Sequence, residues 1–515
     1  MKIINENTRH KGRPCALTLI ALMLLAPVMA NAQIRIDWQQ CYGNEGSTDY
    51  ASSIAPANDG FVIYGQIGNC LNQGMCNCTA NNNATPWLIQ IGNQGELKWQ
   101  QCITPMDNGN EYEPIMVRKS VSTEGKDEYY LSTHSHGEVV ITKVDANGEE
   151  LWKRMNSFYG NFIFPTSDGG VVFDGSYGPL DKSYIEDSLV KLDGQGRLEW
   201  GLSLGEGYEY TRGESVYQSS DGDYYALGRT GSGAVFYRIS RDGQIVWRRK
   251  YGNTFYDRLL SIVEIEDGFL LAGQISSEMV GNHGRSDVWL VRTDKEGEAL
   301  WTRCYGGSMY DDFYGIFYNL DGGFTVFAQS NSTDGDVFSN SQSGVDVYKI
   351  WMFHTNALGT MDWEQCIGSV NHSVCCNDVV QTGNYRYTLA GWMWNDDTSS
   401  GDGDVNCSNS QFLPNSGYNY WVLQVTDTIN SAGVPEPMAL EKVQVHPNPT
   451  TGQVTIIGKS LCQVVVSNFM GQHLLTAESE GDELTLDIGS LPAGIYFVTS
   501  TDKEGRKCVR KVVKE

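Results

Sequence analysis

Hydrophobic and polar residues alternate along most of the chain in short runs separated by glycine turns. The clearest repeat is an apolar strand, a tight turn and a second strand that carries a tryptophan. Such short alternating runs predict half-buried β-strands, whereas a helical solenoid would show a 3.6-residue period. The apolar strand occurs seven times, at residues 87–91, 139–144, 188–192, 235–239, 288–292, 348–353 and 420–425.

Six of the seven copies continue through a glycine turn into the tryptophan strand. The turn glycines are Gly95, Gly148, Gly196, Gly243, Gly297 and Gly359, and the tryptophans are Trp99, Trp152, Trp200, Trp247, Trp301 and Trp363. The seventh copy runs into a linker, but residues 34–38 carry Trp38 in the same pattern and lack a strand before them. We expect the repeated tryptophans to pack between units.

A second hairpin completes each unit. Its turn is Asp-Gly at Asp59, Asp168, Asp221, Asp267 and Asp321, with looser copies at Gly125 and Gly383. Glycine supplies the positive φ that short hairpin turns require. Four strands per unit and a Trp-to-Trp spacing of 47 to 62 residues are typical of β-propeller blades. We therefore predict an all-β, seven-bladed propeller at residues 33–427, in which the N-terminal strand closes the last blade and no sheet edge is left open.

The pattern changes after Thr426. A turn-rich linker at residues 428–440 leads into a segment without tryptophan, residues 441–515, which contains about six or seven short apolar runs. Runs of this length at this spacing predict a small β-sandwich. Cys462 and Cys508 are the cysteines of this module. Since one falls in an early strand and the other in the last, we expect a disulfide between them.

Composition narrows the class of protein. Hydrophobic residues make up 40% and charged residues 19% of the 515 residues, which excludes a disordered chain or a coiled coil. The net charge of -25 repels phosphate backbones and anionic lipids, so nucleic-acid binding is excluded as a function.

The first 32 residues have the features of a signal peptide. A basic segment ends at Arg13, an apolar run covers residues 15–29, and Ala30-Asn31-Ala32 is a small-x-small cleavage site. No later run reaches the 18 apolar residues or so of a membrane span. We expect a secreted or surface protein whose twelve remaining cysteines meet an oxidising compartment. Their pairing in the propeller stays open.

Two resemblances follow from these residues. The repeats resemble the acidic, Trp-containing propeller repeats of secreted Bacteroidetes proteins. The C-terminal module resembles the (type A) sorting domain of the type IX secretion system, on the motif residues Pro447, Asn448, Pro449, Gly452, Leu491, Pro492, Ala493, Gly494, Tyr496, Phe497, Lys511 and Lys514. This resemblance implies that the secretion machinery and its surface sortase are partners, and that the module is removed at the cell surface.

We expect the prolines and Gly452 to fix a rigid entry turn, and Gly494 to permit a tight turn into a strand. The basic end of the chain is expected to meet an acidic receptor surface.

Function is expected on the longer connections of the propeller, at residues 68–86, 174–187, 274–287, 328–347 and 395–419. Asp334, Asp336, Asp402 and Asp404 place alternate carboxylates in flexible turns, which predicts calcium as a cofactor. The alternative is that these carboxylates cap their own backbone. For Asp49, Asp257 and Asp311, which precede the first strand of their units, the choice is between turn capping and the mouth of the central channel.

Hydrolase and nucleotide-binding motifs are absent from the sequence. We predict a binding or interaction protein for an unknown glycan or protein ligand. The alternatives are a secreted propeller enzyme acting on polysaccharide and a quinoprotein-like dehydrogenase. The second alternative depends on a superficial likeness of the Asp145–Trp152 repeat and on the adjacent pair Cys375 and Cys376. We predict no catalytic residues.

Overall fold

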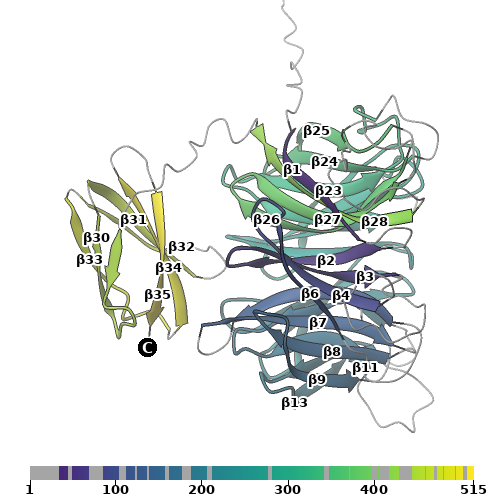
Figure 1. Ribbon diagram of the computed structural model, residues 1–515. Coiled ribbons are helices and arrows are strands. Elements are labelled where there is room, and N and C mark those ends of the chain that lie inside the picture. Colours follow the sequence, from purple (N-terminus) through teal and green to yellow (C-terminus); the bar gives the residue numbers. More distant parts are fainter. Residues whose placement is uncertain are drawn as a thin grey trace, which may run out of the picture.

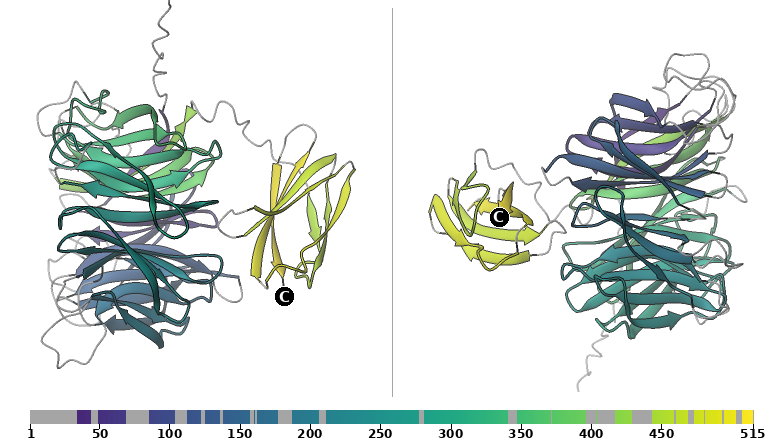
Figure 2. Two further views of the ribbon diagram at one scale, coloured as in Figure 1. Left: turned by 180° about the vertical axis from the view of Figure 1, so that it is seen from behind. Right: turned by 90° about the horizontal axis from the view of Figure 1, so that it is seen from below.

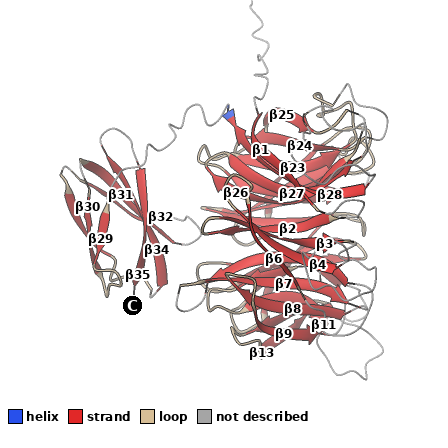
Figure 3. Ribbon diagram, in the orientation of Figure 1, coloured by secondary structure: helices blue, strands red, loops and turns tan. Residues whose placement is uncertain are grey.

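The computed structural model describes residues 34–43, 49–68, 85–103, 112–121, 125–135, 138–156, 160, 162–176, 187–205, 211–276, 281–340, 347–370, 372–395, 404, 417–428, 443–458, 460–468, 473–479, 481–492, 494–502 and 507–514. The expected signal peptide at 1–32, Asp402, Ala493 and most of the linker at 428–440 lie outside these residues. Strands dominate the described part of the chain (Figures 1 and 3).

Seven four-stranded antiparallel sheets, blades 1 to 7, account for the residues up to Asp427. Blade 1 contains β2 (Tyr50–Ala57), β3 (Gly60–Ile67), β4 (Thr85–Ile91) and β5 (Leu97–Cys102), and blade 2 contains β6 (Tyr112–Val121), β7 (Asp127–Ser135), β8 (Glu138–Asp145) and β9 (Glu150–Asn156). Blade 3 contains β10 (Ile163–Pro165), β11 (Val171–Ser176), β12 (Asp187–Leu192) and β13 (Leu198–Ser203). Blade 4 contains β14 (Thr211–Gln218), β15 (Tyr224–Thr230), β16 (Gly233–Ile239) and β17 (Ile245–Tyr251). Blades 5 and 6 are formed by β18 (Arg258–Ile265), β19 (Gly268–Ile275), β20 (Asp287–Thr293) and β21 (Ala299–Tyr305); and β22 (Asp311–Tyr318), β23 (Phe324–Ser330), β24 (Lys349–Thr355) and β25 (Met361–Ile367). Blade 7 is formed by β26 (Val374–Gly383), β27 (Arg386–Asn395), β28 (Gly417–Asp427) and β1 (Ile34–Tyr42).

The blades form a closed ring. The first strand of each blade contacts the first strand of a neighbouring blade, and β2 of blade 1 contacts both β6 of blade 2 and β26 of blade 7. The first strands are therefore innermost, and the fourth strands lie at the circumference. Figure 2 shows the stacked sheets from two further directions. This arrangement is the predicted propeller.

The first strand of the chain closes the last blade. β1 pairs antiparallel with β28, with Ile34 opposite Asp427 and Tyr42 opposite Tyr420. Trp38 lies opposite Gln424, so it belongs to the same sheet as Tyr420. Cys41 and Tyr42 are buried by the pairing. The prediction that residues 34–38 supply the missing outer strand is confirmed.

The repeated tryptophans pack against the next blade. Each turn glycine of the apolar hairpin lies on a tryptophan of the preceding blade, in the pairs Gly95–Trp38, Gly148–Trp99, Gly196–Trp152, Gly243–Trp200, Gly297–Trp247 and Gly359–Trp301. The six glycines have φ between 73° and 82°. A Cβ atom at any of them would lie 2.8–3.1 Å from the indole. Glycine is required twice here, for its backbone conformation and for the close approach of the ring.

Replacing one of these glycines is expected to destabilise the propeller. Gly297→Ala combines a left-handed alanine with overlap on Trp247, which together are expected to cost about 2–4 kcal/mol. Urea denaturation followed by tryptophan fluorescence measures the change. Gly231→Ala is the matched control, because a Cβ there meets no atom within 4 Å. Equal stability of the two variants would contradict the packing role.

A second repeated contact was not predicted from the sequence. In every blade the residue opposite the tryptophan on the third strand is polar, and in five blades it is a cation or histidine: Gln90, Lys143, Lys191, Arg238, Arg292, His354 and Gln424. Lys191 is 1% exposed and its Nζ lies 2.9 Å from Asp168 of the Asp-Gly turn. Arg292 pairs with Asp267 in the same way, and His354 with Asp321. Asp168 and Asp267 therefore also neutralise the buried cations Lys191 and Arg292, which a buried charge requires. The basic residue that recurs in the apolar strand is the feature of the sequence from which this contact could have been predicted.

The C-terminal module consists of two facing sheets. One contains β29 (Gln444–His446), β30 (Gln453–Ile457) and β33 (Glu483–Asp487), and the other contains β31 (Leu461–Asn468), β32 (His473–Glu478), β34 (Gly494–Asp502) and β35 (Lys507–Lys514). Val454, Ile456, Val464, Val466 and Val498 are buried between them. The predicted β-sandwich is confirmed.

The predicted disulfide between Cys462 and Cys508 is wrong. Cys462 lies on β31 and Cys508 on β35, and β34 runs between these strands because it pairs with both. Two strand spacings separate the backbones by about 10 Å, beyond the roughly 7 Å that a disulfide spans between Cα atoms. The prediction used the order of the strands along the chain, which does not give their order in the sheet.

Candidate functional site

The propeller has two unlike faces. The tight turns between first and second and between third and fourth strands lie on one face, because the strands of a blade alternate in direction. The connections between second and third strands, and those between blades, lie on the other face, which we call the loop face. The strand ends that flank the connections predicted to carry function all lie on the loop face. Their lengths differ widely: β27 and β28 are joined by residues 396–416, and β15 and β16 by Gly231 and Ser232 alone.

Buried aspartates anchor the loop face. Asp49, Asp257 and Asp311 are fully buried where the chain enters the first strands of blades 1, 5 and 6. Asp257 accepts hydrogen bonds from the backbone N–H groups of Asn253, Thr254 and Ser276. Asp49 accepts from the Gly68 N–H at 2.7 Å. Each carboxylate thus ties two connections of its blade together, which is the capping role and not an exposed position at the channel.

Asp311 has the same position in blade 6. It accepts hydrogen bonds from the Gly307 N–H at 2.8 Å, the Ser332 hydroxyl at 2.9 Å and the Ser330 hydroxyl. Burial raises its pKa from 3.8 to about 6, against the lowering effect of these donors. The folded protein therefore holds a proton on this carboxyl at a pH where the unfolded chain has lost it.

This pKa predicts a pH dependence. The stability that Asp311 contributes is fully present below its unfolded pKa and is lost as the pH rises through its folded pKa. Between pH 4 and pH 7 the wild type is expected to lose up to about 3 kcal/mol relative to Asp311→Asn, which cannot ionise. Urea titrations of both proteins across this range measure the difference. A constant difference between them would contradict the raised pKa.

The carboxylates predicted to bind calcium contact backbone amides. Asp334 accepts from the Ser308 N–H at 2.8 Å, and Asp336 from the Gly306 N–H at 3.2 Å. Asp404 accepts from the Gly368 N–H at 3.4 Å, while Asp402 lies outside the described residues. Within the described ranges no group of three or more His, Cys, Asp or Glu side chains is placed to hold a metal ion. Asp334, Asp336 and Asp404 thus cap amides of other connections and not their own backbone. Calcium stays a prediction that a chelator-insensitive melting temperature would contradict.

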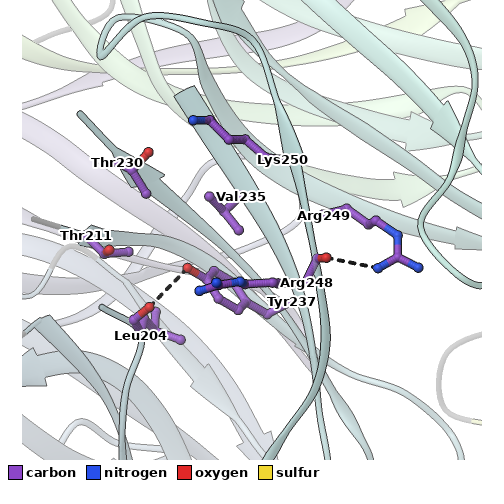
Figure 4. Close-up of a pocket in the computed structure, with 8 residues that line it drawn as sticks. All are labelled: Leu204, Thr211, Thr230, Val235, Tyr237, Arg248, Arg249 and Lys250. Carbon is purple, nitrogen blue, oxygen red and sulfur yellow. Dashed lines mark hydrogen bonds between the residues drawn. The ribbon is translucent and has the colours of Figure 1, made fainter. Parts of the chain in front are cut away.

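A cavity opens on the loop face at blade 4, and the sequence analysis did not anticipate it. Its volume is about 210 Å³. It lies between the end of blade 3 and the sheet of blade 4 and is lined by Leu204, Thr211, Thr230, Val235, Tyr237, Arg248, Arg249 and Lys250 (Figure 4). The Tyr237 hydroxyl donates to the Leu204 carbonyl at 3.2 Å, and Lys250 donates to the Ser232 hydroxyl at 2.6 Å. Arg249 lies at its edge and pairs with Glu298.

In the C-terminal module the two ends of the predicted sorting signal lie together. The Asn448 side chain accepts a hydrogen bond from the Val513 N–H at 2.8 Å, and the Thr450 N–H donates to the Val513 carbonyl at 2.9 Å. The Tyr496 hydroxyl donates to the Pro492 carbonyl at 2.7 Å. The entry turn is therefore attached to the last strand.

The remaining signal residues are placed as follows. Gly494 begins β34 opposite Lys514, which is buried, and neither Gly452 nor Gly494 has a positive φ. Neither glycine therefore uses the left-handed backbone conformation, and the tight turn at Gly494 stays a prediction. Phe497 and Lys511 lie opposite each other on β34 and β35.

Residues 444–515 match the family model described as "Secretion system C-terminal sorting domain". The C-terminal module is a type IX secretion sorting domain. With a sorting domain at its end, the protein is secreted or displayed at the outer-membrane surface. No helix among the described residues has the length and hydropathy to cross a membrane.

Solved structures resemble the chain at low identity. A protein of unknown function from Dyadobacter fermentans is 10% identical, with 76% of this chain and 99% of that chain covered and a TM-score of 0.39. PorZ, a surface component of the type IX secretion system of Porphyromonas gingivalis, is 12% identical, with 90% and 81% covered and a TM-score of 0.24. A puromycin hydrolase is 11% identical, with 80% and 59% covered and a TM-score of 0.41. No curated protein matches the sequence. Likenesses this low carry no argument about function.

Proposed function

We propose that the protein is a binding module that the type IX secretion system delivers to the cell surface, where its loop face meets a glycan or protein ligand. The observation that carries the proposal is the combination of a sorting domain with a closed ring of blades. Tight turns occupy one face of the ring, whereas connections of widely different length occupy the other, so its variable surface is the loop face. Buried aspartates hold that face in place.

The sorting domain is proposed to carry the recognition residues on the entry turn and on β34 and β35. Asn448 joins the entry turn to the last strand, so both parts are presented together. The secretion machinery and its surface sortase are the proposed partners. After removal of the module, the propeller would stay at the surface or be released.

An array experiment tests the binding function. The chain from residue 33 to its end, labelled and applied to glycan and protein arrays, is expected to bind a restricted set of ligands. Asp257→Ala unties the loop connections of blade 5, which rest on three backbone hydrogen bonds to this residue. It is expected to change the set of bound ligands. Binding to no array member would contradict the proposal.

A further inference from the structure

The cavity of blade 4 lies where this blade departs from the repeat at three positions. The first is on the third strand. In blades 1, 5, 6 and 7 the third strand carries a buried tryptophan three residues before the residue that pairs with the repeated tryptophan of the fourth strand. These third-strand tryptophans are Trp87, Trp289, Trp351 and Trp421. Blade 4 has Val235 there. Val235, which lines the cavity, is smaller than tryptophan by most of an indole ring.

The second departure is opposite that position. Trp87, Trp289, Trp351 and Trp421 each face a cysteine on the fourth strand, whereas Val235 faces Lys250. Blades 2 and 3 also lack the tryptophan, but their Val140 and Ser188 face the uncharged Met155 and Ser203. Of the seven register pairs, that of blade 4 alone has both no tryptophan on the third strand and a cation on the fourth strand.

The third departure concerns the buried aspartate. Asp257 and Asp311 lie three residues before the β-bulge of their strands, at Leu260 and Tyr314. Thr211 lies three residues before the corresponding bulge at Glu214. It faces Thr230 in register, as Asp311 faces Ser330 in blade 6. At this position blade 4 therefore keeps the neighbouring hydroxyl and has a threonine in place of the aspartate.

These substitutions change the chemistry of the site. The lining contains the hydroxyls of Thr211, Thr230 and Tyr237 and the cationic groups of Arg248 and Lys250, and none of the eight lining residues is acidic. Arg248 is adjacent to Tyr237 on the paired strand. In a chain of net charge -25, a pocket of this composition favours an anionic group, which charge-assisted hydrogen bonds would hold.

We propose that this cavity binds a sugar carboxylate, with the ligand supplying the carboxylate that Asp49, Asp257 and Asp311 supply within their own blades. The volume of about 210 Å³ is below the roughly 300–1,000 Å³ of pockets for drug-sized ligands, so it suits a single residue of a chain or one small molecule. Three hydroxyls match the hydroxyls of a sugar ring, and Leu204 and Val235 provide apolar contact. A uronic acid combines these features, whereas a lone acidic side chain of a peptide would leave the hydroxyls unused.

Titration of the chain from residue 33 onward with D-glucuronate, D-glucose, sodium sulfate and a short aspartate-containing peptide tests the proposal. Saturation-transfer NMR or calorimetry is expected to show D-glucuronate binding at least tenfold more tightly than the other three. Equal binding of sulfate or tighter binding of the peptide would overturn the assignment to a uronic acid. Binding of none of the four would overturn the site itself.

Variants that restore the repeat locate the site. Thr211→Asp returns the internal carboxylate and Val235→Trp returns the indole, and each is expected to weaken glucuronate binding at least tenfold. Lys250→Gln removes the cation with little change in size, so it tests the same site if Val235→Trp does not fold. Arg303→Gln, an exposed position on the fourth strand of blade 5, is the control and is expected to bind as the wild type does. Unchanged binding by Thr211→Asp and Lys250→Gln would overturn the proposal.

This inference rests on the proposed binding function but is tested separately. A silent array together with glucuronate binding that Thr211→Asp abolishes would contradict the array ligands and leave the cavity assignment in place. If the protein binds array ligands and neither Thr211→Asp nor Lys250→Gln changes its binding to glucuronate, the cavity assignment is contradicted and the proposed binding function is kept.

Discussion

A chain that lacks residues 34–42 is expected to lose the cooperative unfolding transition of the propeller. Without β1, the whole of β28 becomes an exposed edge, and Trp38 no longer covers Gly95 of blade 1. The pairing also buries Cys41 and Tyr42. Each buried side chain of this size contributes about 1.5–3 kcal/mol, so the loss approaches the 5–15 kcal/mol or so by which a domain is stable. Circular dichroism in urea and limited proteolysis measure it.

The control for this deletion removes the same length of chain, residues 429–437, from the linker. That variant is expected to unfold as the wild type does. A synthetic peptide of residues 33–43 added to the shortened chain is expected to restore part of the transition, because it can reoccupy the edge of β28. An unchanged transition in the chain without residues 34–42 would contradict closure of the ring by this strand.

Removal of residues 507–515 is expected to abolish appearance of the protein at the cell surface. The last strand pairs with β34 along its length and holds the entry turn through Val513, so its loss removes one part of the sorting signal and detaches the other. Surface protein is expected to fall more than tenfold, with the chain retained in the periplasm. Cell fractionation and surface labelling in a host with a type IX system measure the distribution.

The truncated module is also expected to unfold, so a second variant separates recognition from folding. Asn448→Ala removes one hydrogen bond to the last strand, at a cost of about 1 kcal/mol, and leaves the core of the sandwich intact. It is expected to lower export while the module stays folded. Normal export of both variants would contradict the assignment of the sorting signal to these residues.

The blade count was predictable because each blade repeats a local pattern. A strand, a glycine with positive φ and a tryptophan follow one another within about a dozen residues, so the contacts that select them are visible along the chain. The orphan strand at residues 34–38 was recognisable for the same reason. Its partner is far away in sequence, but the repeat already showed which strand was missing.

The sites were harder to predict because they depend on comparisons between blades. Val235 looks like an ordinary strand residue until its register partner is known to be Lys250 where other blades place a cysteine. Thr211 becomes informative when it is aligned with Asp311 across a β-bulge. The disulfide prediction for Cys462 and Cys508 was wrong because the order of strands along the chain does not show that β34 lies between β31 and β35.

The position of β1 also sets the order of folding. β1 precedes all the other described strands in the chain, and it can find its partner, β28, only when the residues up to Asp427 have followed it. Until then six blades can assemble by local hairpins, while in blade 7 the edge of β28 that pairs with β1 is still exposed. The last step is thus the longest-range one, and during export this late-closing strand is the segment that a chaperone must shield from other edges.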